Sequence, residues 1–261
     1  MKSVTRRQLL VPIGLAAGSC VLSSCLSENR ATKYKKGGFP WRYDELDPDV
    51  TAERAYHYCD KGCMYGVFAS VMLQMAEKRG EPYRSFPVDM MRYGAGGAGG
   101  SGSLCGALNG GAALMGLFAG TGEQTNQLIS GLFLWYEQAA LPMYMPRKPD
   151  LNVEVPRSVS HSVLCHVSVS RWCEASGYEA SNKLRKERCR RLTADTAGKT
   201  VEFLSAGFAG RYLAIAELSE DVKKCQSCHM SDSELSNSRG DMDCGSCHFS
   251  LAKDHPKVST G

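Results

Sequence analysis

Two copies of a short cysteine motif lie near the end of the chain. The motifs are CQSCH at residues 225–229 and CGSCH at residues 244–248, and both have the C-x-x-C-H pattern that attaches c-type haem. Two thiols at this spacing can add to the two vinyl groups on one edge of a porphyrin, and the adjacent histidine then binds the iron from one side. We therefore expect two covalent haems. The attachment residues would be Cys225, Cys228, Cys244 and Cys247, and the proximal iron ligands would be His229 and His248.

The same four cysteines also have the C-x2-C-x15-C-x2-C spacing of a zinc ribbon, or they could form disulfides. The histidine after each pair favours haem, because a four-cysteine zinc site needs no histidine. The chain after about residue 218 has few large apolar side chains, so two haems would supply the apolar mass that this segment lacks. The 14 residues from Met230 to Asp243 span at most about 50 Å, so the two haems would lie near each other.

The iron of each haem needs a sixth ligand or an open coordination site. The candidate sixth ligands are the remaining histidines of the chain, His57, His161, His166 and His255. Each of them could instead be an ordinary surface or core histidine. Alternatives for the sixth ligand are a methionine of this chain and a histidine from a second subunit. Bis-histidine ligation would give the haem a lower reduction potential than methionine–histidine ligation.

Six more cysteines lie upstream of the two motifs. They are Cys59, Cys63, Cys105, Cys165, Cys173 and Cys189. In an exported protein they could form three disulfide bonds. Alternatively, thiolates from several helices could converge on iron in a cluster or another redox centre. The residues alone leave both hypotheses open.

Helical periodicity predicts the elements that position these cysteines. We expect helices over residues 48–79, with Asp47 as N-cap, and over residues 103–118, 124–140, 158–175 and 184–206. The first helix would place Cys59 and Cys63 on one face, and the fourth would do so for His161, Cys165 and Cys173. No segment has a convincing strand periodicity, so the predicted fold class is mostly α.

The glycine-rich segment at residues 94–99 matches G-x-G-x-x-G, the dinucleotide-binding pattern. That pattern needs a preceding strand and an acidic residue about 20 positions further on. The preceding residues are a poor strand, and Ala113, Leu114 and Met115 stand at the expected distance. We therefore predict that the glycines lead the backbone into Cys105 at the start of a helix, where the helix dipole favours a thiolate.

The N-terminus has the features of an export signal. A basic start with the twin-arginine-like sequence TRRQLL precedes an apolar stretch, residues 9–22, that is too short to span a bilayer. The sequence LSSC ending at Cys25 is similar to a lipoprotein box, so Cys25 would carry a lipid that anchors the protein to the membrane, unless it is removed with the signal. We expect a periplasmic or otherwise exported protein.

The order of the upstream cysteines resembles a known family pattern. The segments KGCMYGVF and SLCGALNGG, followed by Cys165 and Cys189, resemble redox-active proteins with the C-GCAxxG-C-C pattern. With two C-x-x-C-H motifs after it, the chain from about residue 50 to 261 resembles the split-Soret cytochrome c family. The resemblance implies a homodimer that brings four haems together, bis-histidine iron, and an iron–sulfur or related site. Its implied ligands are Cys63, Cys105, Cys165 and Cys189, with Cys59 and Cys173 as alternates.

These features divide the chain into four parts. They are a signal at 1–25, a polar tether at 26–46, a helical cysteine-rich redox domain at 47–217 and a dihaem segment at 218–261. The expected function is electron transfer with redox protein partners, and the alternative is a small haem reductase with an open iron position. We favour the carrier over an enzyme, because the sequence has no hydrolase, metalloprotease or phosphate-binding motif.

The charge of the chain argues against nucleic acid as a partner. The net charge of +4 is small and dispersed along the sequence. One dense basic run lies at residues 182–191. We expect this run to form a solvated helix face, and an acidic redox partner is the alternative explanation for it.

Overall fold

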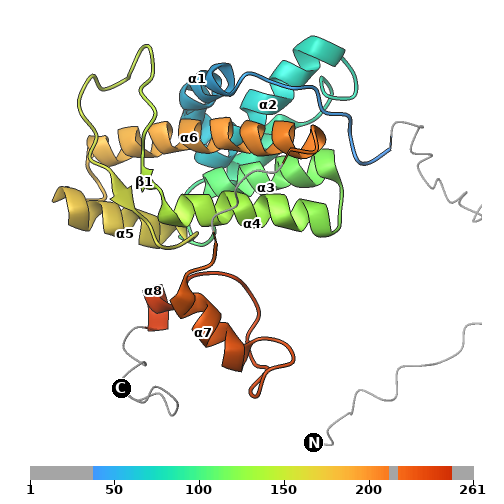
Figure 1. The fold of residues 1–261 in the computed structure, drawn as a ribbon. Helices are drawn as coiled ribbons and strands as arrows, with labels where there is room; N and C mark the ends of the chain where they lie inside the picture. The colour runs from blue at the N-terminus through green and yellow to red at the C-terminus, as the bar shows by residue number, and fades with distance from the viewer. Residues whose placement is uncertain (1–37, 212–216, 249–261) are drawn as a thin grey trace, which may run out of the picture. The chain divides into compact units, whose positions relative to one another are not determined.

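The described part of the computed structural model comprises residues 38–211 and 217–248. The predicted signal, most of the predicted tether and His255 lie outside these ranges. The described residues contain eight α-helices and two short strands, which confirms the expected mostly helical fold (Figure 1). No helix among them is long and apolar enough to cross a membrane.

The first expected helix is two helices in the structure, α1 (Pro48–Tyr58) and α2 (Cys63–Arg79). Asp47 caps α1 as predicted, since its Oδ1 accepts hydrogen bonds from the backbone N–H groups of Asp49 (2.8 Å) and Val50 (3.2 Å). A single 3-10 turn (Cys59–Lys61) separates the two helices.

The break between α1 and α2 occurs at Gly62, whose φ of 115° is one that L side chains rarely adopt. The prediction that Cys59 and Cys63 share a face of one continuous helix was therefore wrong. Cys59 begins the 3-10 turn and Cys63 begins α2. The turn brings both residues to the same end of the helical core.

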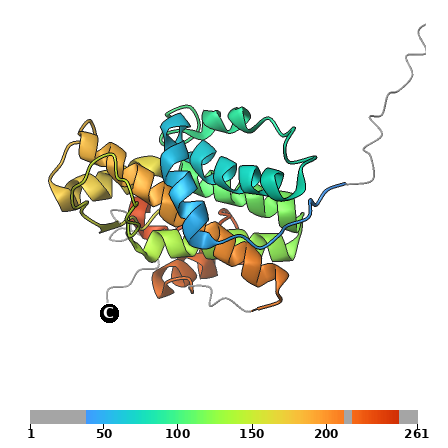
Figure 2. The same cartoon turned by 90° about the horizontal axis from the view of Figure 1, so that it is seen from above.

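Helix α2 is the central element of the core. Twelve of its 17 residues are buried, which is typical of a helix that is covered on every side. It packs against α1, α3 (Gly106–Ala119) and α6 (Lys183–Phe208), and α4 (Glu123–Gln138) covers α3 and α6 (Figure 2). Helix α3 approaches α2 closely at Gly110, where a Cβ atom would lie 2.8 Å from the carbonyl oxygen of Met64.

The fourth expected helix starts later than predicted. Residues 158–159 pair with residues 140–141 as the antiparallel strands β2 and β1, and α5 runs only over Cys165–Ser176. His161 lies before α5 with a φ of 50°, so it does not share a helix face with Cys165 and Cys173. The other three expected helices are confirmed within three residues at each end as α3, α4 and α6.

The compact part of the chain begins at Phe39. Trp41 and Tyr43 pack on the hydrophobic core, and Leu46 is buried in it. The backbone N–H of Trp41 donates to the carbonyl of Leu117 at 2.9 Å. Residues 39–46, which the sequence assigned to the tether, therefore belong to the packed structure.

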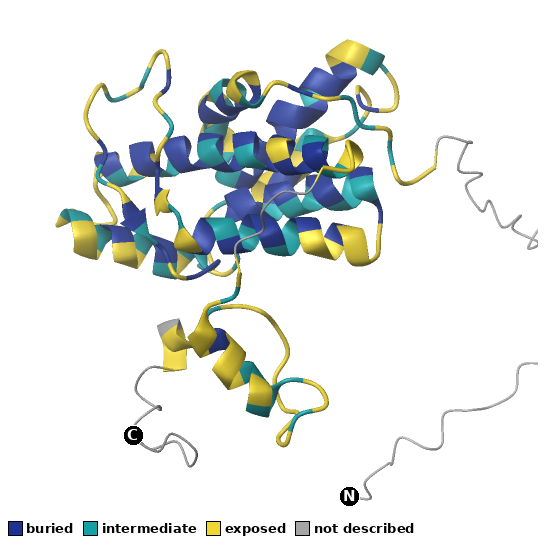
Figure 3. Cartoon of the chain, in the orientation of Figure 1, coloured by how far each residue is buried: buried dark blue, intermediate teal, exposed yellow. Residues whose placement is uncertain are grey.

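The segment with the two C-x-x-C-H motifs contains α7 (Glu220–His229) and the single-turn α8 (Gly245–His248). The hydroxyl of Ser219 caps α7 by accepting the backbone N–H of Val222 at 3.3 Å. Among the side chains described between residues 217 and 248, only that of Val222 is buried (Figure 3). This agrees with the expectation that the segment has no side-chain core of its own.

Candidate functional site

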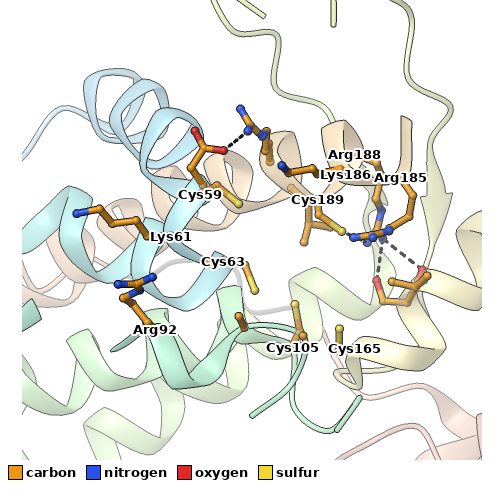
Figure 4. Close-up of a pocket in the computed structure, with 18 of the residues that line it drawn as sticks. Cys59, Lys61, Cys63, Arg92, Cys105, Cys165, Arg185, Lys186, Arg188 and Cys189 are labelled. Carbon is orange, nitrogen blue, oxygen red and sulfur yellow. Dashed lines mark hydrogen bonds and ion pairs between the residues drawn. The ribbon is translucent and has the colours of Figure 1, made fainter. Parts of the chain in front are cut away.

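Five of the six upstream cysteines line one cavity of about 500 Å³ (Figure 4). They come from the 3-10 turn, from α6 and from the starts of α2, α3 and α5. The five residues are Cys59, Cys63, Cys105, Cys165 and Cys189. None of the ten cysteines in the described part of the chain is in a disulfide. The tertiary structure therefore gathers thiols that are up to 130 positions apart in the sequence.

Specific contacts hold these cysteines around the cavity. The backbone N–H of Cys105 donates to Val163 O at 2.8 Å, and that of Cys165 donates to Ser103 O at 2.7 Å. These two bonds fix the start of α3 beside the start of α5. On the other side, the Cys59 sulfur lies 3.3 Å from Oγ1 of Thr193 on α6.

Three of the five cysteines lie at helix N-termini, where unpaired backbone N–H groups and the helix dipole favour a thiolate. Cys63 and Cys165 are the first residues of α2 and α5, and Cys105 is the N-cap of α3. The predicted position of Cys105 at a helix start is thus confirmed.

Burial has the opposite effect on the cavity thiols. Removal from water raises the pKa of Cys59 and of Cys165 to about 12. Burial, followed by the nearby Cys105 and Cys59, raises the pKa of Cys63 well above its usual value. A cation that binds these sulfurs must therefore displace protons from them.

The glycine in the CGA element lets the sulfur of Cys63 approach α3. A Cβ atom on Gly106 would lie 2.5 Å from the Cys63 Sγ and 2.3 Å from the carbonyl oxygen of Gly94. Only glycine fits against both neighbours without a shift of the backbone. This close approach explains why glycine follows Cys105.

The cavity is lined by more basic than acidic side chains. The basic ones are Lys61, Arg92, Arg185, Lys186, Arg188 and Arg190. Asp60 also lines the cavity, and it forms an ion pair with Arg190. Excess positive charge suits a centre whose ligands become thiolates.

The sequence suggested that the basic run at 182–191 forms a solvated helix face, but part of this run is buried. Four charged residues of α6 are at most 5% exposed, namely Glu187, Arg188, Arg190 and Arg191. Arg191 pairs with Glu187 through Nε and Oε1 at 2.7 Å. One side of α6 in this run is therefore buried, and the one acidic residue of the run, Glu187, pairs with Arg191 there.

Tyr136, Ser168 and Arg188 form a hydrogen-bonded group in the cavity that the sequence did not assign to the site. The Tyr136 and Ser168 hydroxyl oxygens lie 2.8 Å apart, and Nη2 of Arg188 donates to Ser168 Oγ at 2.7 Å. Burial is the main cause that raises the pKa of Tyr136 well above its usual value. Nothing in their local sequence distinguishes them from ordinary helix residues.

The remaining predicted ligands lie elsewhere. Cys173 is on α5 but packs beside Val155, Trp172 and Leu184 instead of lining the cavity. His57 is exposed, and its Nε2 lies 3.1 Å from Oε1 of Glu53. Neither it nor His161 or His166 lines the cavity, and their assignment as sixth haem ligands stays a prediction.

The first C-x-x-C-H motif lies at the C-terminal end of α7. Cys225, Cys228 and His229 are spaced i, i+3 and i+4, so they share one helix face. Nδ1 of His229 lies 2.8 Å from Oδ1 of Asn237, and donation from Nδ1 would make Nε2 the nitrogen with the lone pair. The arrangement suits a proximal haem ligand.

The two motifs lie close together. Burial raises the pKa of Cys244, and its neighbour Cys225 from the first motif raises it further. The second motif continues into α8 with Cys247 and His248, both exposed. The four motif cysteines are exposed or half-buried, so they are accessible for attachment.

Comparison with known proteins defines the class of the protein. The sequence profile of the redox-active protein family C_GCAxxG_C_C matches residues 67–203, which span α2 to α6 and so contain most of the cavity. This chain is therefore a member of that redox-active class.

Two relatives narrow the assignment. The split-Soret cytochrome c of Desulfovibrio desulfuricans is 37% identical in an alignment of 269 positions that covers 96% of each chain. A solved structure, described as a novel iron centre in the split-Soret cytochrome c of that organism, matches with a TM-score of 0.77 and 38% identity. The match covers 81% of this chain and 92% of the other. The chain belongs to the split-Soret cytochrome c family, which confirms the resemblance drawn from the cysteine pattern.

Proposed function

We propose that this protein is an exported electron-transfer protein with two covalent c-type haems and an iron–thiolate centre in the five-cysteine cavity. Membership in a cytochrome c family and the iron centre named for its relative support the haem and iron assignments. Two observations carry the proposal together: five thiols converge on one cavity, and the sequence has a separate pair of C-x-x-C-H motifs.

The haem segment supplies the residues for attachment and ligation. Cys225 and Cys228 would form thioethers with one haem, and Cys244 and Cys247 with the other. His229 and His248 would bind the two irons, and Asn237 would orient the ring of His229. Each haem, when bound, would supply one-electron exchange between ferrous and ferric iron.

The cavity fits a polynuclear centre better than a single metal ion. Its thiol ligands are of the soft type that binds iron–sulfur clusters. A volume of about 500 Å³ leaves room for more than one metal atom. We propose Cys63, Cys105, Cys165 and Cys189 as ligands, with Cys59 as the alternate.

Metal and haem analysis of the native protein tests the proposal. We expect two haems per chain by mass and by the pyridine haemochrome, and iron and acid-labile sulfide beyond the two haem irons. Two low-spin haems that do not bind carbon monoxide would support a carrier, whereas an open high-spin iron would support the reductase alternative. A colourless zinc protein, or a mass map with three disulfides among the upstream cysteines, would contradict the assignment.

We further propose that the protein forms a homodimer and docks with redox protein partners. The low burial of the segment at 217–248 supports this, because haems bound there need cover that the segment does not provide. Sedimentation of the haem-loaded protein should give twice the chain mass. A monomer at micromolar concentration would contradict the dimer.

Export and lipidation also belong to the proposal. The twin-arginine-like sequence and the cysteine at position 25 support them, and c-type haem is attached outside the cytoplasm. Fractionation should place the protein in the periplasm or on its membranes. Replacement of Cys25 by alanine should release it into the soluble fraction without loss of haem.

A further inference from the structure

Arg188 is a buried cation that forms no ion pair with any acidic side chain of the described residues. It lies on α6, is 1% exposed and lines the five-cysteine cavity (Figure 4). Its Nη2 donates to Oγ and O of Ser168 at 2.7 and 3.4 Å, and its Nη1 lies 3.9 Å from the sulfur of Cys189. Its buried Nε has no hydrogen-bond partner among the described residues.

The neighbouring arginines of α6 differ in this respect. Arg190 forms ion pairs with Asp60 and Asp150, and Arg191 pairs with Glu187. No acidic side chain in the described part of the chain forms an ion pair with Arg188. The ionisable side chains that interact most strongly with it are Cys189, Tyr136 and Cys105, in that order. Asp195, which forms no ion pair with it, and Cys165 also interact with it electrostatically.

A guanidinium cannot relieve this situation by losing its proton. A buried charge without a counter-charge is strongly destabilising, so a structure that retains one needs a negative partner nearby. The cavity cysteines can provide that partner, because each thiol loses its proton when it binds iron.

We infer that Arg188 is the buried counter-charge of the iron–thiolate centre and that it raises the reduction potential of that centre through Cys189. This inference rests on the proposed metal centre. Reduction adds negative charge to the centre, and a nearby cation in a low-dielectric site stabilises the reduced form. Arg188 is thus a positioning and tuning residue, not a metal ligand.

The other cavity cations are less suited to this role. Arg92 and Lys186 are exposed, so water and salt screen them. Arg185 is half-buried and donates to the carbonyl of Ala180 at 2.7 Å. It lies one turn before Arg188 on α6 and lines the same cavity, which makes it a matched control.

Potentiometric titration of the full haem-loaded protein, followed by the EPR signal of the non-haem centre, tests the inference. Arg188→Gln keeps a hydrogen-bond donor but removes the charge, and we expect its potential to fall by at least 59 mV, a tenfold change for one electron. Arg188→Lys and Arg185→Gln should each shift the potential by less than half of that value. The haem absorbance of the same samples shows whether a shift is confined to the non-haem centre.

Equal shifts in Arg188→Gln and Arg188→Lys, or a shift of the same size in Arg185→Gln, would overturn the role of the buried charge. An unchanged potential in Arg188→Gln would do the same. If the parent protein contains no non-haem iron, the proposed metal centre itself is wrong, and this outcome is distinct from an unchanged potential.

Thermal unfolding provides a second readout if Arg188→Gln loads iron poorly. After removal of non-haem iron, this variant should unfold at or above the temperature of the parent treated in the same way, because an unpaired buried charge has been removed. Lower stability of the iron-free variant would show that Arg188 has only a structural role and would overturn the inference.

Discussion

Replacement of Gly106 by alanine tests whether the sulfur of Cys63 lies against the first turn of α3. The new Cβ would lie 2.3 Å from a backbone carbonyl oxygen and 2.5 Å from the Cys63 Sγ. Contacts between such atoms are normally about 3.5 Å, so both neighbours, or α3 itself, must move by roughly 1 Å. The carbonyl of Gly94 is backbone and cannot rotate away, whereas the sulfur can.

The expected result is loss of the metal centre with retention of the haems. Overpacking of this kind costs typically about 1–3 kcal/mol of unfolding free energy. The displaced sulfur would also lower the non-haem iron content. Metal analysis and the EPR signal measure the second effect, and the Soret band reports whether the haems remain.

Gly116 is the matched control on the same helix. It lies in α3, and a Cβ atom there would meet nothing within 4 Å. Gly116→Ala should leave the iron content unchanged and stabilise the helix by about 0.5–1 kcal/mol. A Gly106→Ala protein with full iron content and parental stability would refute the close contact between Cys63 and α3.

Three further predictions follow from individual side chains. Metal analysis should show that the Cys105→Ser protein loses non-haem iron and that the Cys173→Ser protein retains it, because Cys173 lies outside the cavity. Equal loss of iron in both variants would be inconsistent with this site. Asn237→Ala removes the oxygen that accepts from His229 Nδ1, so His229 becomes a less basic ligand of the haem iron. Spectroelectrochemistry should then show a higher reduction potential for one haem. A lower potential would contradict the role of Asn237 in orienting His229. Burial raises the pKa of Asp195 to about 6, so its folded form binds a proton more tightly than the unfolded chain does. The stability that this group contributes is present below pH 4 and is lost as the pH rises through about 6; the loss amounts to up to about 3 kcal/mol of unfolding free energy. Thermal melts of Asp195→Asn over the same pH range should not show this loss. An unchanged pH profile would show that the carboxyl is better solvated than the structure indicates.

The sequence by itself determined the features that depend on local spacing. Two C-x-x-C-H motifs fit one porphyrin edge each regardless of the rest of the fold. Helical periodicity located three long helices, and the Asp47 cap followed from its own neighbours. Such signals need only a few consecutive residues, so they can be recognised without the fold.

The break between α1 and α2 and the pairing of β1 with β2 were not recognised in the sequence, because the sequence signals for both are weak. The segment at 48–79 has one helical period, and Gly62 alone breaks it by adopting a positive φ. The pairing of β1 with β2 involves only two residues on each strand, which is too short for a recognisable alternation. His161 consequently lies outside the helix that was expected to contain it.

Only the tertiary structure decided which cysteines form a site. Cys165 and Cys173 lie eight residues apart on one helix, yet one lines the cavity and the other packs against Trp172. Cys59, an alternate by family pattern, joins the cavity because it follows the end of α1, which packs on α6, and its sulfur lies 3.3 Å from Oγ1 of Thr193. Arg188 looks like any other arginine of a basic run, and only the packing of α6 shows that it is buried without an ion pair to a carboxylate of the described residues. Convergence and burial depend on how distant helices cross, and spacing along the chain does not specify that geometry.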